Sequence, residues 1–400
     1  MNATWRSRLL AALGLLLMVV ASVPALVRAA VPTGFTDTVV ASVTQPIDLA
    51  VVAAGPQAGT IYVTSKSGVL NRIPVGSDTA QTALNLEVRT CDEGERGMLG
   101  VALDPEFGNG SSAIYLYYTV RAGECFNRVS RFMVRANGSV NPASEQVLIQ
   151  TARLEATNHN GGDLGFGLDG NLYISIGDNA RSQFAQRKNT YFGKILRITT
   201  DGNPASGNPY RTTKDAVACG VQGRAKKAPC AEVFALGLRN PFRFAFEPNS
   251  NRFLINDVGQ STWEEIDRGR KGANYGWPLR EGPCLQGQSS GCAPAPATYT
   301  DPIFSYSHDT GCDSITAGAF VPDGNGWPAE YQGEYLYADF ICEKMFTLSS
   351  PFSTDPVSAE FADGMGPVID VLFDPTDPGS LLYTELYSDS GGKVHRVKVE

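Results

Sequence analysis

One pattern recurs six times along this chain: an alternating run rich in aromatic and β-branched residues, a polar gap, then a second run that often carries Arg or Lys. Alternating runs bounded by Gly, Pro and Asp predict β-strands, whereas helix-period stretches are scarce after the first thirty residues. The pattern therefore constrains the chain to consecutive antiparallel strands. Its copies cover residues 59–73, 113–134, 171–198, 252–269, 334–348 and 381–399.

Several copies follow a third strand-like run that ends in an acidic turn, at 101–107, 164–171, 244–251 and 371–378. Strand, turn, strand, gap, strand is a β-meander, and radial repetition of meanders protects their edges. We predict an all-β fold, a six-bladed β-propeller of four-stranded antiparallel blades, as one domain over residues 30–400. A β-sandwich is the alternative, although sandwiches seldom reach this length as one domain.

The first residues have the features of a secretory signal. Arg6 and Arg8 precede an apolar run at 9–23, and small residues then lead to Ala29 and Ala30. The run is short for a membrane span, so we expect a signal peptide over residues 1–29; an uncleaved N-terminal anchor is the alternative. No later segment is long and apolar enough to span a bilayer, and we expect a periplasmic or secreted protein.

Eight cysteines follow the predicted signal, and none forms a CxxC pair. An even count in an exported chain favours disulfides. Proximity in the sequence suggests the pairs 91–125, 219–230, 284–292 and 312–342, although eight cysteines allow about 105 pairings. The two short loops, 219–230 and 284–292, are the firmest of these predictions.

The charge of the chain argues against a nucleic-acid partner. The formal charge is −8, and it becomes −11 when Arg6, Arg8 and Arg28 leave with the signal, because no acid lies in the first 29 residues. Phosphate backbones need a basic footprint on the protein, which this composition lacks.

The segment Gly165–Gly170 fits the dinucleotide-binding pattern GxGxxG. That pattern has meaning only between a strand and a helix, and here a strand follows directly. We therefore predict a hairpin turn at this place instead of a nucleotide loop.

Two segments carry side chains suited to chemistry. His159 lies among amides and glycines, where a ligand can approach an imidazole that moves protons near neutral pH. Arg239, next to Asn240 and Pro241, has a guanidinium suited to carboxylates. An Arg that only braces a loop between blades is an equally good interpretation of Arg239.

Five stretches together resemble one known family: GERGMLGVALDPEF (94–107), HNGGDLGFGLDGNLYISIGD (159–178), GLRNPFRFAFEP (237–248), DVGQSTWEEIDRGRKGANYGWP (257–278) and YLYADFICEKMFTL (335–348). The chain resembles the soluble PQQ-dependent sugar dehydrogenases, a family of glucose, aldose and sorbosone dehydrogenases that also includes hedgehog-interacting-protein-like proteins. The resemblance covers nearly all of the chain after the predicted signal, in consistent order.

The resemblance implies oxidation of an aldose at its anomeric carbon to the lactone, with hydride to PQQ and the proton to His159. Arg239 and Asn240 match the pair that lies against PQQ, and Arg239 would stabilise charge on the quinone oxygen. The carbonyls of Gly259 and Gln260 match those that hold calcium. Two further matches, Asp178 and Gln183, correspond to residues that line the sugar site. The electron acceptor is not identified by the sequence.

Other positions depart from the family's pattern. Glu95, which faces the cofactor position, stands where the glucose dehydrogenases have an amide, and Asn158 stands where they have an acid. Among late basic residues only Lys344 matches a cofactor-binding position, with Lys393 or Arg396 as further candidates.

Two other functions stay open. A cofactor-free extracellular propeller that binds a protein or glycan would explain Glu95 and the missing basic residues. A calcium-dependent lactonase would need inward acidic metal ligands, of which the sequence shows no obvious cluster. Among the remaining features, His308 overhangs the pocket or lies at the surface beside a cysteine, and His395 is structural. Of Glu264 and Glu265, one orients the calcium loop and the other faces solvent.

Overall fold

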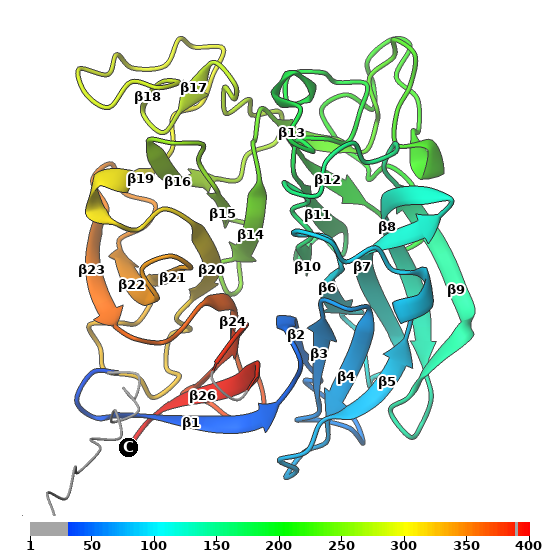
Figure 1. The fold of residues 1–400 in the computed structure, drawn as a ribbon, viewed down its shortest axis with the longest axis vertical. Helices are drawn as coiled ribbons and strands as arrows, with labels where there is room; N and C mark the ends of the chain where they lie inside the picture. The colour runs from blue at the N-terminus through cyan, green and yellow to red at the C-terminus, as the bar shows by residue number, and fades with distance from the viewer. Residues whose placement is uncertain (1–30, 389–390) are drawn as a thin grey trace, which may run out of the picture.

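A computed structural model describes residues 31–388 and 391–400. The predicted signal segment lies outside these residues. The described chain forms six four-stranded antiparallel sheets arranged around a common axis, which confirms the predicted six-bladed propeller (Figure 1). None of the helical segments within the described ranges has the length and apolar character needed to cross a bilayer.

The six repeats identified in the sequence are the two middle strands of each blade. Blade 1 contains β2 (Pro46–Val51), β3 (Ile61–Ser65), β4 (Val69–Ile73) and β5 (Gln81–Asn85); blade 2 contains β6 (Met98–Leu103), β7 (Ala113–Ala122), β8 (Glu124–Val134) and β9 (Val140–Gln150). Blade 3 contains β10 (Leu164–Phe166), β11 (Leu172–Ile176), β12 (Lys194–Ile198) and β13 (Val233–Leu236); blade 4 contains β14 (Pro241–Phe246), β15 (Phe253–Asp257), β16 (Trp263–Arg268) and β19 (Phe304–Ser307). Blade 5 contains β20 (Ile315–Phe320), β21 (Tyr335–Asp339), β22 (Lys344–Ser349) and β23 (Val357–Ala362); blade 6 contains β24 (Val368–Phe373), β25 (Ser380–Glu385), β26 (Lys393–Val399) and β1 (Phe35–Ser42).

Blade 6 closes the ring, because β1 near the start of the chain pairs with β26 at its end (Figure 1). Pairing the two ends of the chain in one sheet leaves the ring without an open blade. The remaining elements are a short hairpin of β17 (Arg280–Glu281) and β18 (Cys284–Leu285), and four 3-10 turns, η1 (Glu87–Arg89), η2 (Ser182–Phe184), η3 (Gly220–Gln222) and η4 (His308–Thr310).

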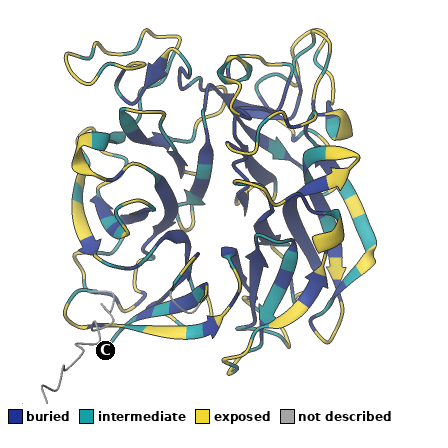
Figure 2. Cartoon of the chain, viewed as in Figure 1, coloured by how far each residue is buried: buried dark blue, intermediate teal, exposed yellow. Residues whose placement is uncertain are grey.

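Burial follows position in the blade. The second strands β3, β7, β11, β15, β21 and β25 are buried almost throughout, whereas the outer strands β1, β5, β9 and β23 contain exposed residues (Figure 2). Each inner sheet face packs on the neighbouring blade, so strands such as β2 and β20 are apolar at most positions.

Two local predictions are confirmed. The GxGxxG segment is the tight turn between β10 and β11, in which the Gly170 N–H donates to the carbonyl of Gly167 at 2.9 Å. All four expected disulfides are present: Cys91–Cys125, Cys219–Cys230, Cys284–Cys292 and Cys312–Cys342.

The start of the innermost strand is irregular in five of the six blades within the described residues, the exception being the blade of β10. A bulge re-aims the side chains beside it. These irregular starts all lie at one end of the propeller axis, and five of their residues line the pocket described below: Ile47, Leu99, Phe242, Thr316 and Ile369.

Candidate functional site

A pocket of about 510 Å³ opens at that end of the axis, with every blade contributing to its wall. The volume lies in the range of small-molecule sites, and the wall combines apolar side chains with convergent polar groups. The polar and charged residues on it are Lys66, Glu95, Asn158, His159, Arg239, Asn240, Arg243, Gln260, Asp313, Ser314 and Thr316. Seven residues that the sequence analysis named therefore line this pocket: Glu95, Asn158, His159, Arg239, Asn240, Gly259 and Gln260.

His159 is held rigidly at the pocket wall. Its backbone is in the left-handed region, with φ at 57°, and it is only 7% exposed. Non-glycine residues adopt this conformation at an energetic cost, and such strain concentrates at functional sites. Gly177 makes the conformation possible, since a Cβ on Gly177 would lie 2.2 Å from the His159 carbonyl oxygen.

The imidazole of His159 is oriented by a buried carboxylate. Nδ1 of His159 lies 2.7 Å from Oδ1 of Asp178, and the other oxygen of Asp178 accepts the indole N–H of Trp277 at 2.8 Å. An ionised Asp178 requires the proton on Nδ1, which leaves Nε2 as the basic nitrogen. Nε2 has no protein partner in the part of the chain that the structure describes.

The two predicted sugar ligands lie away from the pocket wall. Asp178 is 1% exposed and is bonded behind the His159 ring, so the structure places it as the partner of His159. Gln183, in η2, is exposed and is not among the residues that line the pocket. The indole of Trp277, which also holds Asp178, was not identified from the sequence; its place in NYGWP after the calcium-loop stretch offered no local signal.

Glu95 fastens the loop of His159 to blade 4. Its Oε2 accepts the backbone N–H of His159 at 2.8 Å and the side-chain N–H of Asn240 at 3.3 Å. The amide oxygen of Asn240 in turn accepts the N–H of Gly161 at 3.0 Å. The carboxylate of Glu95 is therefore engaged by two donors, and Asn240 joins two loops at the wall.

Arg239 lies on the pocket wall, where the loop of Gly259 and Gln260 orients its side chain. Its guanidinium donates to the carbonyl of Val258 at 2.8 Å and to the side-chain oxygen of Gln260 at 3.0 and 3.1 Å. The backbone N–H groups of Arg239 and Asn240 both donate to Asp257, at 2.9 and 2.6 Å. Burial raises the pKa of Asp257 to about 7 against the effect of these two bonds.

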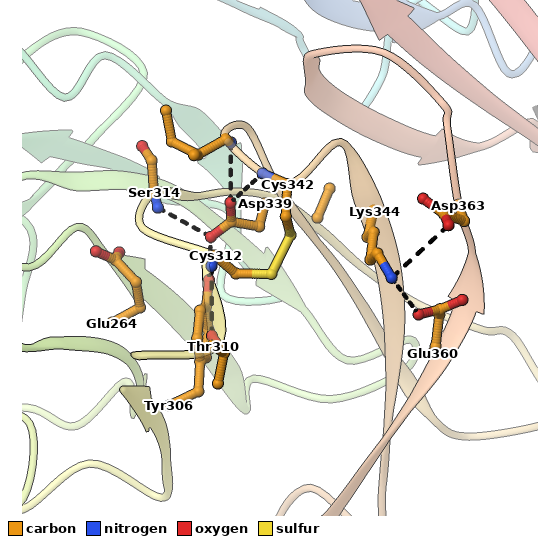
Figure 3. The surroundings of a disulfide bond; sticks show 12 residues. Glu264, Tyr306, Thr310, Cys312, Ser314, Asp339, Cys342, Lys344, Glu360 and Asp363 are labelled. Atoms are coloured by element: carbon orange, nitrogen blue, oxygen red, sulfur yellow. Dashed lines mark hydrogen bonds and ion pairs between the residues drawn. A yellow bond between two sulfur atoms is a disulfide. The ribbon is translucent and has the colours of Figure 1, made fainter. Parts of the chain in front are cut away.

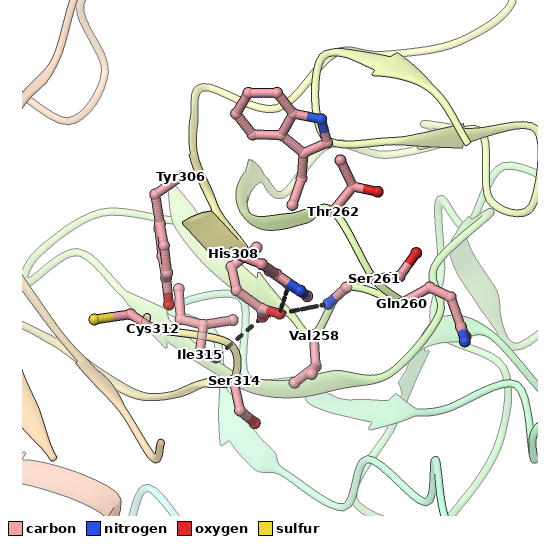
Figure 4. A network of polar contacts seen from close by, with 12 residues as sticks. Val258, Gln260, Ser261, Thr262, Tyr306, His308, Cys312, Ser314 and Ile315 are labelled. Atoms are coloured by element: carbon pink, nitrogen blue, oxygen red, sulfur yellow. Dashed lines mark hydrogen bonds and ion pairs between the residues drawn. The ribbon is translucent and has the colours of Figure 1, made fainter. Parts of the chain in front are cut away.

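The loop of Gly259 and Gln260 is held from behind by two carboxylates. Glu264 accepts the N–H of Gly259 at 3.2 Å, the ring Nε2–H of His308 at 2.8 Å and the N–H of Ile315 at 3.0 Å (Figure 4). Glu281 accepts the N–H of Gln260 at 2.9 Å and those of the next three residues. Within the described chain, no donor reaches the carbonyl oxygens of Gly259 and Gln260.

Of the neighbouring residues Glu264 and Glu265, one was expected to orient the calcium loop, which is confirmed for Glu264. The other was expected to face solvent, which is wrong for Glu265. Glu264 orients the loop, and His308, which is bonded to Glu264, is not among the residues that line the pocket. Glu265 does not face solvent: it is 8% exposed, because the insertion that carries β17 and β18 covers this side of β16. His395 is structural as expected, bonded to Asp37 and Glu385.

A cluster of inward acids exists that the sequence did not reveal. Carboxylate oxygens of Asp257, Glu265 and Asp267 lie within 4.8 Å of one another, and all three residues are buried. Burial raises the pKa of Asp267 and of Glu265 well above the usual range. Because the three residues sit on adjacent strands and not on the pocket wall, the cluster gives no support to a lactonase with its metal in this pocket.

The late basic residues do not reach the pocket wall. Lys344 donates to Glu360 at 2.7 Å and lies 3.7 Å from Asp363, on the far side of the Cys312–Cys342 disulfide (Figure 3). Lys393 is paired with Glu385, and Arg396 with Asp374 and Asp377. A cation that was not identified from the sequence, Lys66, lies on the wall instead and donates to the carbonyl of Asp92.

The floor of the pocket carries a buried charge network. Arg243, 1% exposed, contacts Asp370 at 3.3 Å and donates to the carbonyl of Ile47 at 2.9 Å. Asp163 accepts the N–H of Phe244 at 2.6 Å, which ties blade 3 to blade 4. Burial raises the pKa of Asp163 to about 7, with Arg243 acting in the opposite direction.

The chain matches a known protein family. The family described as Glucose / Sorbosone dehydrogenase matches residues 43–377. The HIPL2 protein of Arabidopsis thaliana is 34% identical over 255 residues, 58% of this chain and 35% of the relative. Aldose sugar dehydrogenase YliI of Escherichia coli is 31% identical over 188 residues, 46% of this chain and 47% of the relative.

The matched region spans about a third to a half of the length of these curated relatives. Among solved structures, the PQQ-bound aldose sugar dehydrogenase of Streptomyces coelicolor superposes with a TM-score of 0.71 at 23% identity, covering 93% of this chain and 100% of that one. At this identity the superposition supports the fold alone.

Proposed function

The chain belongs to the glucose/sorbosone dehydrogenase family, and from this premise we propose that it oxidises an aldose at the anomeric carbon to the lactone with PQQ as cofactor. The observation that carries the proposal is the His159–Asp178 pair at the pocket wall, with Nε2 of His159 left open. A related protein is named aldose sugar dehydrogenase, and another has been solved with PQQ bound. The four disulfides support an oxidising location, periplasmic or secreted.

The chain's own residues supply the proton chemistry. In our proposal the anomeric hydroxyl of the sugar donates to Nε2 of His159, which takes the proton as the hydride leaves the same carbon. The carboxylate of Asp178 stabilises the imidazolium that forms, through the 2.7 Å contact to Nδ1. Arg239 provides a positive charge on the pocket wall for the negative charge that develops on the acceptor.

The residues that line the pocket are compatible with binding of PQQ. When bound, PQQ would accept the hydride. The pocket has room for a ring system, and Lys66 and Arg239 offer two cations for acidic groups. The negative charge of Glu95 opposes binding of the acidic cofactor less than a free carboxylate would, because two N–H donors already engage it. A role for Lys344 would require it to leave Glu360.

Calcium has suitable oxygen donors at two places. The first is the pair of carbonyls of Gly259 and Gln260, two residues that line the pocket and match the family's calcium position. The second place is the buried cluster of Asp257, Glu265 and Asp267, where both carboxylate oxygens of Asp267 lack a hydrogen-bond partner among the described residues. Hard cations prefer carboxylate and carbonyl oxygens of this kind.

Reconstitution tests the proposal. The purified protein is loaded with PQQ and calcium, and dye reduction is measured with a panel of aldoses. We expect sugar-dependent reduction in the wild type, and its loss in His159→Ala with PQQ binding retained. Absence of both cofactor retention and sugar-dependent reduction would overturn the proposal, and an unchanged rate in His159→Ala would overturn the role of the base.

A cofactor-free binding propeller is the second candidate. It is favoured by the HIPL2 relative and by the absence of Lys344, Lys393 and Arg396 from the pocket wall. This alternative predicts that titration with PQQ gives no saturable absorbance change at any calcium concentration. A saturable change that the Arg239→Ala variant weakens would exclude it.

A further inference from the structure

A second hollow lies between blades 2 and 3. It has a volume of about 950 Å³, and we call it the basic cavity. Its charged lining residues are four cations, Arg153, Arg187, Arg224 and Lys226, and one acid, Glu155. This local excess of three positive charges occurs in a chain whose formal charge is −8. A cationic hollow in an acidic protein attracts anionic ligands selectively.

Most of these cations are not neutralised by the protein. In the described chain, the side chains of Arg187, Arg224 and Lys226 form no ion pair, and Arg153 meets Glu124 only at 3.3 Å with both side chains more than half exposed. The one acid, Glu155, is already paired with Arg181 at 2.6 Å. The guanidinium forks are therefore free to bind carboxylate or sulfate groups.

The wall between the cations suits a sugar chain better than a simple ion. Phe126, Phe184 and Phe192 line it; the rings of Phe184 and Phe192 stack at 5.4 Å, and the guanidinium of Arg187 lies 5.2 Å from the centre of the Phe184 ring. The amide side chain of Gln222 adds a hydrogen-bonding group, whereas those of Gln150 and Asn189 are already bonded to Arg128 and to the carbonyls of residues 225 and 226. Apolar side chains combined with a few polar groups are typical of ligand sites of this size.

The cationic segment is preorganised by the insertion that carries it. The Cys219–Cys230 disulfide closes a loop around Arg224 and Lys226, and η3 at its start packs against β9 (Figure 1). The side chain of Asn189 donates to the carbonyls of residues 225 and 226, at 2.8 and 3.2 Å. A ligand that binds here pays little entropy to order the loop.

The basic cavity and the pocket share one loop as a wall. Thr151, Arg153 and Glu155 line the cavity, whereas Asn158 and His159 line the pocket. Three residues span at most about 10 Å of extended chain, so along this loop the two linings come within about 10 Å of one another.

We propose that the basic cavity binds the acidic part of an oligosaccharide, carrying carboxylate or sulfate groups, whose reducing end enters the pocket at His159. The assignment of the reducing end rests on the proposed sugar dehydrogenase function. Binding of the acidic chain in the cavity does not, because it can be measured without turnover.

Calorimetry on the whole protein without added cofactor tests binding first. The probes are oligogalacturonate, a sulfated chondroitin fragment, a neutral malto-oligosaccharide of equal length and a poly-glutamate peptide of equal charge. The test variant carries Arg187→Gln, Arg224→Gln and Lys226→Gln, and the control carries the same charge change outside the cavity, Arg211→Gln, Lys214→Gln and Lys271→Gln. These positions are exposed, and unchanged melting temperatures confirm that both variants fold.

We expect at least one acidic oligosaccharide to bind, with an affinity at least tenfold weaker in the test variant and changed less than twofold in the control. Binding by oligogalacturonate alone assigns the cavity to carboxylates, and binding by both assigns it to acidic sugars in general. Equal binding of the neutral chain or of poly-glutamate, or an equal loss in the control variant, would overturn the proposal.

Turnover then separates the two proposals. Loaded with PQQ and calcium, the wild type should show at least tenfold higher kcat/KM for an acidic oligosaccharide than for its neutral counterpart, and the test variant should lose that preference. Activity on neutral aldoses without any binding of acidic chains would refute the proposed ligand of the basic cavity and leave the proposed dehydrogenase function in place. Binding without dehydrogenase activity would refute the proposed function and the assignment of the reducing end while leaving the cavity's ligand in place.

Discussion

The contact between His159 and Asp178 makes a sharp prediction. In Asp178→Asn, the side-chain oxygen can still accept the indole N–H of Trp277, so the amide nitrogen is turned toward Nδ1 of His159. A donor at that position requires Nδ1 to be unprotonated, which places the ring proton on Nε2. The nitrogen that should accept the sugar's proton is then already occupied.

The size of the effect follows from the bond that is lost. A hydrogen bond to a charged group contributes about 1.5–3 kcal/mol, and about 1.36 kcal/mol corresponds to a factor of ten in rate. We therefore expect kcat/KM for the aldose to fall at least about 10- to 150-fold, with the wrong tautomer adding to the loss. Stopped-flow dye reduction measures the rate, and absorbance titration measures PQQ binding, which should be unchanged.

Asp169→Asn is the matched control, because Asp169 lies in the turn between β10 and β11, paired with Arg197 at 2.6 Å and away from the pocket wall. This variant should keep its rate within twofold. A rate in Asp178→Asn that equals the control's would show that the carboxylate does not set the tautomer. Loss of PQQ binding in Asp178→Asn would show that the residue supports the pocket as a whole.

Three further predictions concern residues that surround the pocket: Gly177, Asp163 and Asp267. Gly177→Ala should reduce kcat/KM more than tenfold and stability by about 1–3 kcal/mol, because its Cβ would lie 2.2 Å from the carbonyl of His159; wild-type kinetics in a folded variant would contradict this. The pKa of Asp163 is raised by burial to about 7, so between pH 5 and 8 the native protein binds more protons than the unfolded chain and this residue's contribution to stability falls as pH rises. Denaturant melts of the chelator-treated protein should show the wild type losing about 3 kcal/mol relative to Asp163→Asn over that range, and parallel curves would refute the assignment. Calcium at a hundredfold excess over its Kd should stabilise the wild type by about 2.7 kcal/mol in calorimetric melts, and Asp267→Asn should lose most of that gain; a full gain in the variant would place the ion elsewhere.

The blades could be predicted because their signals are local. Alternation over five or six residues, and turns such as Gly167–Gly170, depend on neighbours in the chain, and the repeats in the sequence are the middle strands of the six blades. The disulfide pairings could be predicted for the same reason, since each bond joins cysteines no more than 34 residues apart.

The candidate site was predictable only in part. The motifs that carry the resemblance placed His159, Arg239 and Asn240 together, and the structure brings all three to one wall. Motif matching assigned Asp178 to the sugar, and local alternation assigned one of Glu264 and Glu265 to solvent, because sequence patterns identify positions but not what covers them. The structure buries Asp178 against Trp277, 99 residues away in the chain.

By itself, the sequence determined the strands, their turns and the number of blades, because these depend on local alternation and on short motifs. The tertiary structure decided which groups neutralise one another. Lys344 is paired on the outer part of blade 5, three acids from two strands form a buried cluster, and four cations separated by up to 73 positions surround the basic cavity. Charges act through space, and only closure of the ring, where β1 joins β26, establishes the distances between them.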